Sequence, residues 1–321
     1  MFGSYTTRSL EGRLVEVFGV SGLVEPEADS QAGRADLRPA AIEANGLIGR
    51  AIWWIDGRDK YMVHLFDGMY VAIPEDNLKD HLPAAPEDGG FDLAWPSQSE
   101  AYPEFALSLG EMLREKGWCC VQMIATEEMR SAAVEQAMRH TKHKVLREEF
   151  VTDYLGQYGS GKTAFLETEV PDPDHLDRLR QDPLSTFDRS LTNASSVVAS
   201  IAWDMLGFPF GDRTKGMMWQ PFATKAEEDS LRPKPLNEED IQEGAIADHI
   251  GFLQRRKLGL MVWLENSGGE ITLLPRHDLP RDPITLPLTT KKLLVYRCDE
   301  LTYEYRPFGH SLVLQSWILA E

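Results

Sequence analysis

The chain has 321 residues, with 33 Lys and Arg against 51 Asp and Glu, which gives a net charge of −18. This excess of negative charge disfavours binding to nucleic acid or to anionic membranes, and no apolar run approaches the roughly 18 to 20 residues that a membrane span needs. The N-terminal segment 1–8 lacks the apolar core of a secretory signal. Adjacent Cys119 and Cys120 seldom bridge each other, and with Cys298 they lack metal-site spacing. We therefore expect an intracellular, soluble protein of one or two domains in a reducing, cytosol-like compartment.

Residues 10–80 show the pattern of a small β domain. Strand-like runs cover 13–18, 49–55, 60–66 and 69–73, and Asp-Gly turns separate the last three. Asp-Gly between alternating strands is a strong hairpin signal. The stretch from Gly49 to Leu78, with its Lys60–Phe66 strand and its Pro74–Leu78 segment, resembles a small SH3-like barrel. The resemblance implies a first domain over residues 1–81, of a fold that commonly binds peptides or packs against a neighbour.

Four aromatic residues of this region are candidates for a groove that binds a protein partner: Trp53, Trp54, Tyr61 and Tyr70. Side chains alternate between the two faces of a strand, so about half of them must face the barrel core. We favour packing in the core and between domains, with a protein partner bound through this barrel as the alternative.

Residues 82–99 have the Pro, Gly and acidic composition of a linker. A second domain is expected over residues 100–321. It opens with a helix over 102–116, a strand over 118–124 and a further helix from Thr126 towards His140. His140 and His143 have a spacing that permits metal binding, but a solvated cationic helix end is the favoured interpretation.

The segment Gly156–Thr163 matches the phosphate-binding pattern Gly-x4-Gly-Lys-Thr, whose backbone amides and lysine bind phosphate at a helix start. Such a site needs a buried strand before it and a long helix after it. The preceding residues 148–155 are only half apolar, and Pro171 leaves room for about two helical turns downstream. We favour a glycine-rich surface turn and keep a P-loop nucleotide binder as the remote alternative.

The middle of the chain has the features of supporting structure for a β domain. Residues 167–188 are polar, residues 195–206 show the apolar stripe of a core helix, and residues 211–221 are expected to form a strand. Residues 223–244 have the composition of an acidic, Pro-containing loop. This loop is either a substrate lid or a solvated insertion.

The last quarter alternates strand-like runs with Gly and Pro turns, over 258–264, 270–274, 293–297 and 311–319. The segment Met261–Pro275, followed by a strand ending at Arg297–Asp299, resembles the distorted double-stranded β-helix of the Fe(II)/2-oxoglutarate oxygenases, in particular the prolyl-4-hydroxylase-like branch. The resemblance covers residues 105–319. We expect an α+β, mainly β protein: a small SH3-like β-barrel followed by a helix-flanked double-stranded β-helix (jelly-roll). A last strand that ends at Leu319 is typical of a module cut from a longer polypeptide.

The resemblance implies a site for Fe(II) and 2-oxoglutarate, with two histidines and one carboxylate on the iron. The first two ligands are normally His-x-Asp on a strand, and the matching residues are His249 and Gly251. The second histidine matches Tyr303. The arginine that binds the far carboxylate of 2-oxoglutarate matches Ser311. Three of the implied groups are therefore replaced.

Two functions remain open. In the first, the barrel has lost its iron triad and acts as a scaffold or binding subunit. In the second, it is an active Fe(II)/2-oxoglutarate-dependent dioxygenase or a halogenase-like enzyme, with His249 and Tyr303 on the iron and Lys257, Arg256 or Arg297 replacing the missing arginine. In another register, the site would be completed by one of His277, Asp278, Asp299 and Glu300. We take the first function as the working hypothesis.

Overall fold

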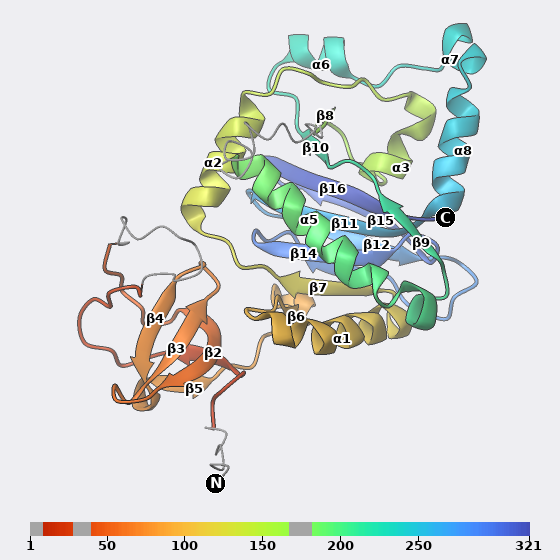
Figure 1. The fold of residues 1–321 in the computed structure, drawn as a ribbon. Coiled ribbons are helices and arrows are strands. Elements are labelled where there is room, and N and C mark those ends of the chain that lie inside the picture. The colour runs from red at the N-terminus through yellow and green to blue at the C-terminus, as the bar shows by residue number, and fades with distance from the viewer. Residues whose placement is uncertain (1–8, 28–39, 167–181) are drawn as a thin grey trace, which may run out of the picture. The chain divides into compact units, whose positions relative to one another are not determined.

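The computed structural model describes residues 9–27, 40–166 and 182–321. The chain divides into two compact units (Figure 1). The first comprises residues 1–83, 95–99 and 123–127, and the second comprises residues 84–94, 100–122 and 128–321. Residues 167–181 of the predicted polar stretch lie outside the described residues.

The first unit contains a five-stranded antiparallel sheet in the order β4-β3-β2-β1-β5. Its strands are β1 Leu14–Val17, β2 Ile48–Ile55, β3 Lys60–Leu65, β4 Tyr70–Pro74 and β5 Leu78–Asp80, with a 3-10 turn at Glu75–Asn77 between β4 and β5. Gly57 and Gly68 take positive φ angles of 80° and 87° in the Asp-Gly turns, a conformation that glycine adopts without steric cost. The two predicted hairpins, β2 with β3 and β3 with β4, are confirmed.

The four aromatic residues of this unit divide between core and surface, as strand alternation requires. Tyr61 is fully buried and meets Trp54 edge-on, with ring centroids 4.9 Å apart. Tyr70 stacks on His64 with ring centroids 4.1 Å apart. Trp53 is 42% exposed. Tyr61 is therefore a core residue and no part of an open groove.

The second unit contains a principal sheet in the order β6-β7-β14-β11-β16-β10-β8, with β9 also paired to β16. Its strands are β6 Leu93–Ala94, β7 Trp118–Gln122, β8 Lys162–Phe165, β9 Phe210–Arg213, β10 Met217–Gln220, β11 Arg256–Asn266, β14 Lys292–Arg297 and β16 Ser311–Ala320. Only β6 and β7 pair in parallel among these neighbours. β6 lies within the predicted linker 82–99, so this stretch contributes a short strand to the second unit.

A smaller antiparallel sheet completes the unit, in the order β13-β12-β15. Its strands are β12 Gly269–Pro275, β13 Ile284–Pro287 and β15 Leu301–Pro307. From β11 onward the chain passes repeatedly between the two sheets, since β11, β14 and β16 belong to the principal sheet and β12, β13 and β15 to the smaller one. The chain is thus α+β and mainly β, with several antiparallel sheets.

Helices take the place of the predicted acidic loop between β10 and β11. Within residues 221–255, the structure has α6 Lys225–Leu231, α7 Glu238–Gln242 and α8 Ala245–Arg255. The acidic, Pro-containing segment predicted as a loop over 223–244 therefore contains two short helices. Capping explains the two short helices: Thr224 accepts from the Glu227 amide, and Asn237 forms a reciprocal capping box with Asp240.

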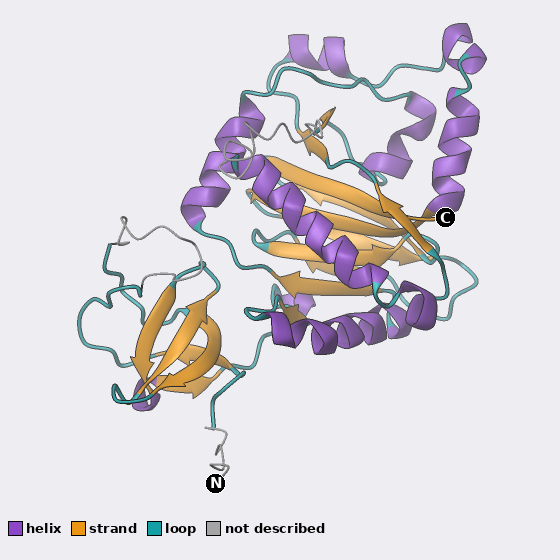
Figure 2. Cartoon of the chain, viewed as in Figure 1, coloured by secondary structure: helices purple, strands orange, loops and turns teal. Residues whose placement is uncertain are grey.

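Two long helices, α1 Tyr102–Glu115 and α5 Pro183–Ala199, pack on the principal sheet (Figure 2). The helix predicted over 195–206 in fact begins at Pro183. Asp182 caps it by accepting from the Leu184 and Ser185 amides, and proline suits the first helical position. α5 ends at Ala199 and a π-helical turn follows at Ala202–Leu206. Among the helices of the described residues, none has the length and apolarity needed to cross a membrane.

Candidate functional site: the interior between the sheets

His249, the first predicted iron ligand, lies on helix α8 and not on a strand. Its side chain is 7% exposed, and its Nε2 lies 3.0 Å from Asp153 Oδ2. The ring of Phe150 stacks on the imidazole, with centroids 3.9 Å apart. Gly251 follows on the same helix, where two residues are separated by about 200° around the axis. The side chains at 249 and 251 therefore cannot face one metal ion as a His-x-Asp strand pair would.

Asp153, on helix α3 Val151–Leu155, binds both His249 and Arg256. Arg256 Nη2 donates to Asp153 Oδ1 at 2.8 Å, and Arg256 Nη1 donates to the Asp153 carbonyl at 2.6 Å. These bonds join α3 to α8 and to the start of β11. Two of the predicted site residues, His249 and Arg256, therefore contact the same carboxylate, that of Asp153. This carboxylate compensates the positive charge of Arg256.

Tyr303, the second predicted iron ligand, lies on β15 inside the space between the two sheets. Its hydroxyl donates to the Tyr154 carbonyl at 2.9 Å and accepts from Gln315 Nε2 at 3.2 Å. Gln315 is fully buried on β16, and its Nε2 also lies 3.4 Å from the Tyr296 hydroxyl. Burial raises the pKa of Tyr303 and the pKa of Tyr296 well above the usual tyrosine value. An iron ligand would have to be a phenolate, the form that this burial disfavours.

Two glycines leave the space that these tyrosine rings occupy. A Cβ atom at Gly259 on β11 would overlap the ring of Tyr296, and a Cβ atom at Gly156 would overlap the ring of Tyr303. The rings of Tyr296 and Tyr303 therefore pack directly against the backbone of Gly259 and of Gly156. We refer to Tyr296, Tyr303 and Gln315 as the tyrosine–glutamine cluster.

Ser311 and Lys257 contribute nothing that would bind a carboxylate in this interior. The Ser311 hydroxyl is buried and lies 2.6 Å from the Tyr305 hydroxyl. Lys257 Nζ donates to the Gln254 carbonyl at 3.2 Å at an exposed position. Lys257 and Ser311 lie near opposite ends of the paired strands β11 and β16.

Arg297 pairs with carboxylates of the turn that follows β14. Its Nη2 lies 2.8 Å from Asp299 Oδ2, and its Nη1 lies 2.9 Å from Glu300 Oε1. Asp299 and Glu300, which another register offered as metal ligands, are thus engaged by arginine. Across the described residues, no group of three or more His, Cys, Asp or Glu side chains is arranged to hold a metal ion. The donor set around His249 and Tyr303 does not fit Fe(II). Of the three candidate cations for 2-oxoglutarate, Arg256 and Arg297 are paired with carboxylates and Lys257 donates to a backbone carbonyl.

The phosphate-loop pattern at Gly156–Thr163 also forms a different structure. Lys162 opens strand β8 and not a helix, and its ammonium pairs with Glu227. Thr163 Oγ1 donates to the Lys144 carbonyl at 2.6 Å. The turn instead extends the smaller sheet, because the Gln157 amide donates to the Tyr303 carbonyl and the Gln157 carbonyl accepts from the Tyr305 amide, both at 2.9 Å. A helix N-terminus that would bind phosphate is absent from this described segment.

One of the site residues that were not predicted, Gln315, has a recognisable signal in the sequence. Gln315 interrupts the apolar run Leu312–Trp317, and a polar residue inside such a run indicates a buried hydrogen-bonding group. Asp153 carries no comparable signal, because it lies in a mixed polar segment 96 residues before His249.

No protein-family model matches the chain, and no curated protein matches it in sequence. It is similar in structure to a Trichoplax adhaerens prolyl hydroxylase solved with a hypoxia inducible factor peptide, at TM-score 0.46 and 9% identity over 69% of this chain and 91% of that one. It is also similar to a Pseudomonas putida prolyl-4-hydroxylase, at TM-score 0.39 and 10% identity over 67% and 99% of the chains. A putative 2OG-Fe(II) oxygenase from Caulobacter crescentus gives TM-score 0.41 and 12% identity over 72% and 87%. These solved structures are prolyl hydroxylases and 2-oxoglutarate/Fe(II) oxygenases, the proteins that the sequence itself resembles.

Proposed function

We propose that the second unit is a double-stranded β-helix that has lost the iron triad of the oxygenases, and that the chain acts as a scaffold or binding subunit. The observation that carries this proposal is the tyrosine–glutamine cluster. Its hydroxyl and amide groups bond to one another and to the Tyr154 carbonyl in the space between the sheets. A buried phenol that donates to a backbone carbonyl is a structural group, and binding a metal would require its ionisation and the loss of that bond.

The strand pattern supports the same proposal. A complete jelly-roll has eight strands in two sheets. Here the smaller sheet has three strands, and the chain between β10 and β11 is helical. His249 is part of that helical segment, where Asp153 holds its Nε2. In the oxygenase pattern a strand presents two ligands to the metal. Here His249 lies on helix α8, and its imidazole contacts the carboxylate of Asp153.

We propose that the first unit is an SH3-like barrel through which the subunit binds a protein partner. Its strand order, with a 3-10 turn before the last strand, supports this assignment. Trp53 is the aromatic side chain that this sheet exposes most among the four candidates. If it contacts a partner, Trp53→Ala should abolish binding, whereas Tyr61→Phe, a conservative change in the core, should preserve it.

A metal titration tests the central proposal. The purified chain is kept anaerobic with 2-oxoglutarate, and Fe(II) or Mn(II) is added while thermal unfolding is followed. A tight site at 100-fold excess over its dissociation constant would add about 2.7 kcal/mol to the free energy of unfolding. We expect no such gain.

His249→Ala is the control that separates a real site from general metal effects. Metal-dependent stabilisation of the wild-type chain that disappears in His249→Ala would establish an active site and overturn the scaffold proposal. Stabilisation that is equal in both chains would indicate binding elsewhere and leave His249 without a metal role.

A further inference from the structure

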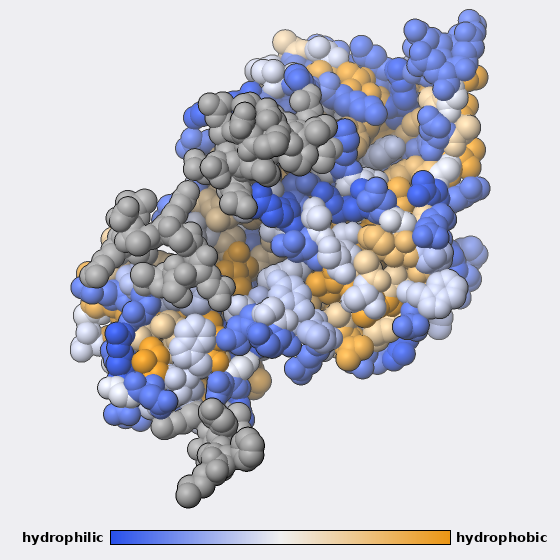
Figure 3. Space-filling view, in the orientation of Figure 1, coloured by the Kyte–Doolittle hydropathy of each residue, from blue (hydrophilic) through white to orange (hydrophobic). Residues whose placement is uncertain are grey.

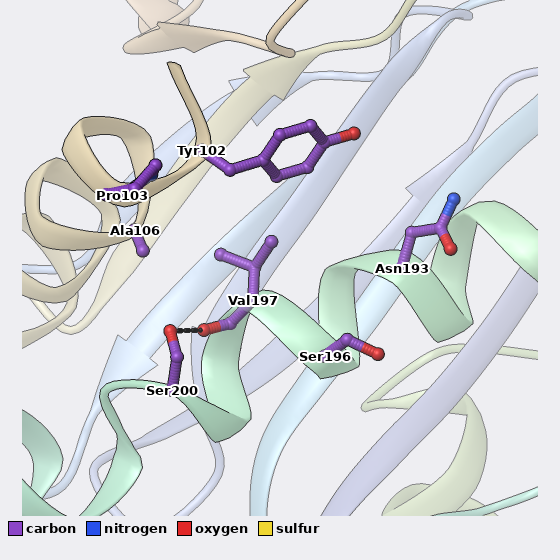
Figure 4. A pocket seen from close by; sticks show the side chains of 7 residues that line it. All are labelled: Tyr102, Pro103, Ala106, Asn193, Ser196, Val197 and Ser200. Carbon is purple, nitrogen blue, oxygen red and sulfur yellow. Dashed lines mark hydrogen bonds between the residues drawn. The ribbon is translucent and has the colours of Figure 1, made fainter. Parts of the chain in front are cut away.

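A pocket of about 520 Å³ lies between helices α1 and α5 of the second unit (Figure 4). This volume falls within the range of about 300 to 1,000 Å³ that is usual for small-molecule sites. Its walls come from Tyr102 and Ala106 on α1 and from Asn193, Ser196, Val197 and Ser200 on α5.

The pocket is separated from the interior between the sheets by the principal sheet itself. Ser316 on β16 accepts from Arg213, which forms a two-bond pair with Asp188 of α5. The neighbouring Gln315 faces Tyr303 of the smaller sheet. Adjacent residues of a strand point to opposite faces, so α5 and its pocket lie on the side away from the tyrosine–glutamine cluster. A ligand here is independent of any iron chemistry.

The lining defines the kind of ligand. The residues of the pocket carry no charged side chain, although the chain as a whole has a net charge of −18. Burying an unpaired charge is costly, so an uncharged ligand fits this lining and an ion does not. Figure 4 shows the phenol ring of Tyr102 across from Val197, which leaves a slot with an aromatic wall and an aliphatic wall.

Three polar residues of α5 and its end line the slot: Asn193, Ser196 and Ser200, of which Ser200 donates its hydroxyl to the Val197 carbonyl (Figure 4). Asn193 and Ser196 lie about one helical turn apart on α5. The Asn193 carboxamide has no hydrogen-bond partner among the described residues and offers both a donor and an acceptor. The Ser196 hydroxyl donates to the Thr192 carbonyl at 3.1 Å, so it remains able to accept. The site can therefore orient a ligand that carries one hydroxyl or amide group.

The surroundings favour a compact ligand over a docked helix. An amphipathic helix binds through a row of large apolar residues along a groove. The exposed positions of α5 beside the pocket are Thr192, Asn193, Ser196, Ala199 and Ser200, which are small or polar. Figure 3 shows hydrophobic and hydrophilic residues interspersed over this face and not one continuous apolar band.

We propose that the pocket between α1 and α5 binds a small, neutral aromatic molecule that carries one hydrogen-bonding substituent. The ring packs between Tyr102 and Val197, and the substituent bonds to Asn193 and Ser196. Nothing in this proposal depends on the first unit or on a metal.

Two probes of the same shape test the charge requirement. 2-Naphthol is neutral at pH 7, and 2-naphthoate is an anion. Binding of each to the full chain is measured by isothermal titration calorimetry. We expect saturable binding of 2-naphthol and affinity for 2-naphthoate that is weaker by about tenfold or more, because the lining offers the carboxylate no cation. Equal binding of the two probes, or no saturable binding of 2-naphthol at millimolar concentration, overturns the proposal.

Two leucine substitutions on α5 test the location. Ser196→Leu fills the pocket and should lower 2-naphthol affinity by about tenfold. Ala199→Leu adds similar bulk at an exposed position that does not line the pocket, so the affinity should stay unchanged. Circular dichroism verifies that both variants fold, and Ser200→Leu replaces Ser196→Leu if the latter does not. Equal affinities of the pocket variant and Ala199→Leu would place the probe elsewhere and refute the site.

Discussion

Replacing Gly251 tests the finding that a helix stands where the oxygenase pattern implied a metal-facing strand. Gly251 lies inside α8, and no atom outside its immediate neighbourhood comes within 4 Å of a Cβ built at this position. Its φ angle is not among the positive ones. Glycine in a helix interior is about 0.8 to 1 kcal/mol less favourable than alanine. Gly251→Ala should therefore stabilise the chain by roughly 0.5 to 1 kcal/mol.

Differential scanning calorimetry measures this gain directly. For a unit of this size, 1 kcal/mol corresponds to about 2 to 4 °C in melting temperature. We therefore expect the transition of the second unit to rise by about 1 to 4 °C in Gly251→Ala. Gly251→Asp should change the free energy of unfolding by less than about 0.5 kcal/mol, because the carboxylate enters open space.

The same variants distinguish a helix from a metal-facing strand. On such a strand, Gly251→Asp would supply the missing ligand and tighten Fe(II) binding. On α8, the new carboxylate points about 200° away from His249, so metal affinity should not appear. A loss of stability in Gly251→Ala, or a gain of Fe(II) affinity in Gly251→Asp, would refute the placement of His249 on α8.

Three further predictions concern buried polar groups. Lys162→Ala should lower the free energy of unfolding by about 1 to 3 kcal/mol in urea titrations, since the Lys162 side chain is only 10% exposed and pairs with Glu227; ATP should stabilise neither chain. The hydrogen bond from Lys162 lowers the pKa of Glu227. The pair therefore stabilises the fold fully above the usual pKa of 4.5, and this stabilisation is lost as the pH falls through the lowered pKa. Lys162→Ala should reduce the dependence of the free energy of unfolding on pH in this range. Tyr303→Phe should cost about 1 to 3 kcal/mol by the same assay, because it removes the hydrogen bond to the Tyr154 carbonyl and leaves the Tyr296 hydroxyl as the remaining partner of Gln315 Nε2 among the described residues. Burial raises the pKa of Cys120 to about 12 and the pKa of Cys119 well above its usual value, so Ellman's reagent at pH 8 should react with these two thiols only after unfolding, whereas Cys298 is partly exposed; rapid reaction of more than one thiol per native chain would contradict the burial of Cys119 and Cys120.

Local signals were sufficient for much of the fold. The Asp-Gly turns specified two hairpins because few other residue pairs take the required backbone angles at low cost. Strand β15 was missed although Leu301, Tyr303 and Tyr305 alternate with less buried residues. The resemblance assigns Tyr303 to a ligand position, whereas the alternation of Leu301, Tyr303 and Tyr305 indicates a strand. The strand-like period was the stronger physical signal.

Helix α5 was predicted only in part because its first half is rich in serine and threonine, which have modest helix propensity. In the structure, the hydroxyls of Thr186, Ser190 and Thr192 donate to carbonyls four residues earlier. These bonds satisfy the side chains inside the helix, and the buried face then packs on the sheet. Packing against a sheet formed by distant segments cannot be read from the local composition.

The candidate site was harder to predict because its contacts join segments that are far apart in sequence. The resemblance to the oxygenases implies which residue types bind the iron and at which sequence positions. Only His249 has the implied residue type at its position. Its actual partner, Asp153, comes from a short helix 96 residues earlier. A match at one residue therefore carries no information about the partner that the fold places beside it.

The packing of the interior between the sheets means that iron binding there would require more than a change of ligands. Removing ligands alone would leave a hollow lined by unpaired polar groups, which costs about 1 to 3 kcal/mol for each buried group. In this interior, Gly259 and Gly156 leave room for two tyrosine rings, and the hydroxyl of Tyr303 has both a donor and an acceptor, while Gln315 Oε1 is buried without a hydrogen-bond partner among the described residues. A return to metal binding would require these rings to move as well as new ligands to appear. Packing and hydrogen bonding thus hold this interior together as a structural core.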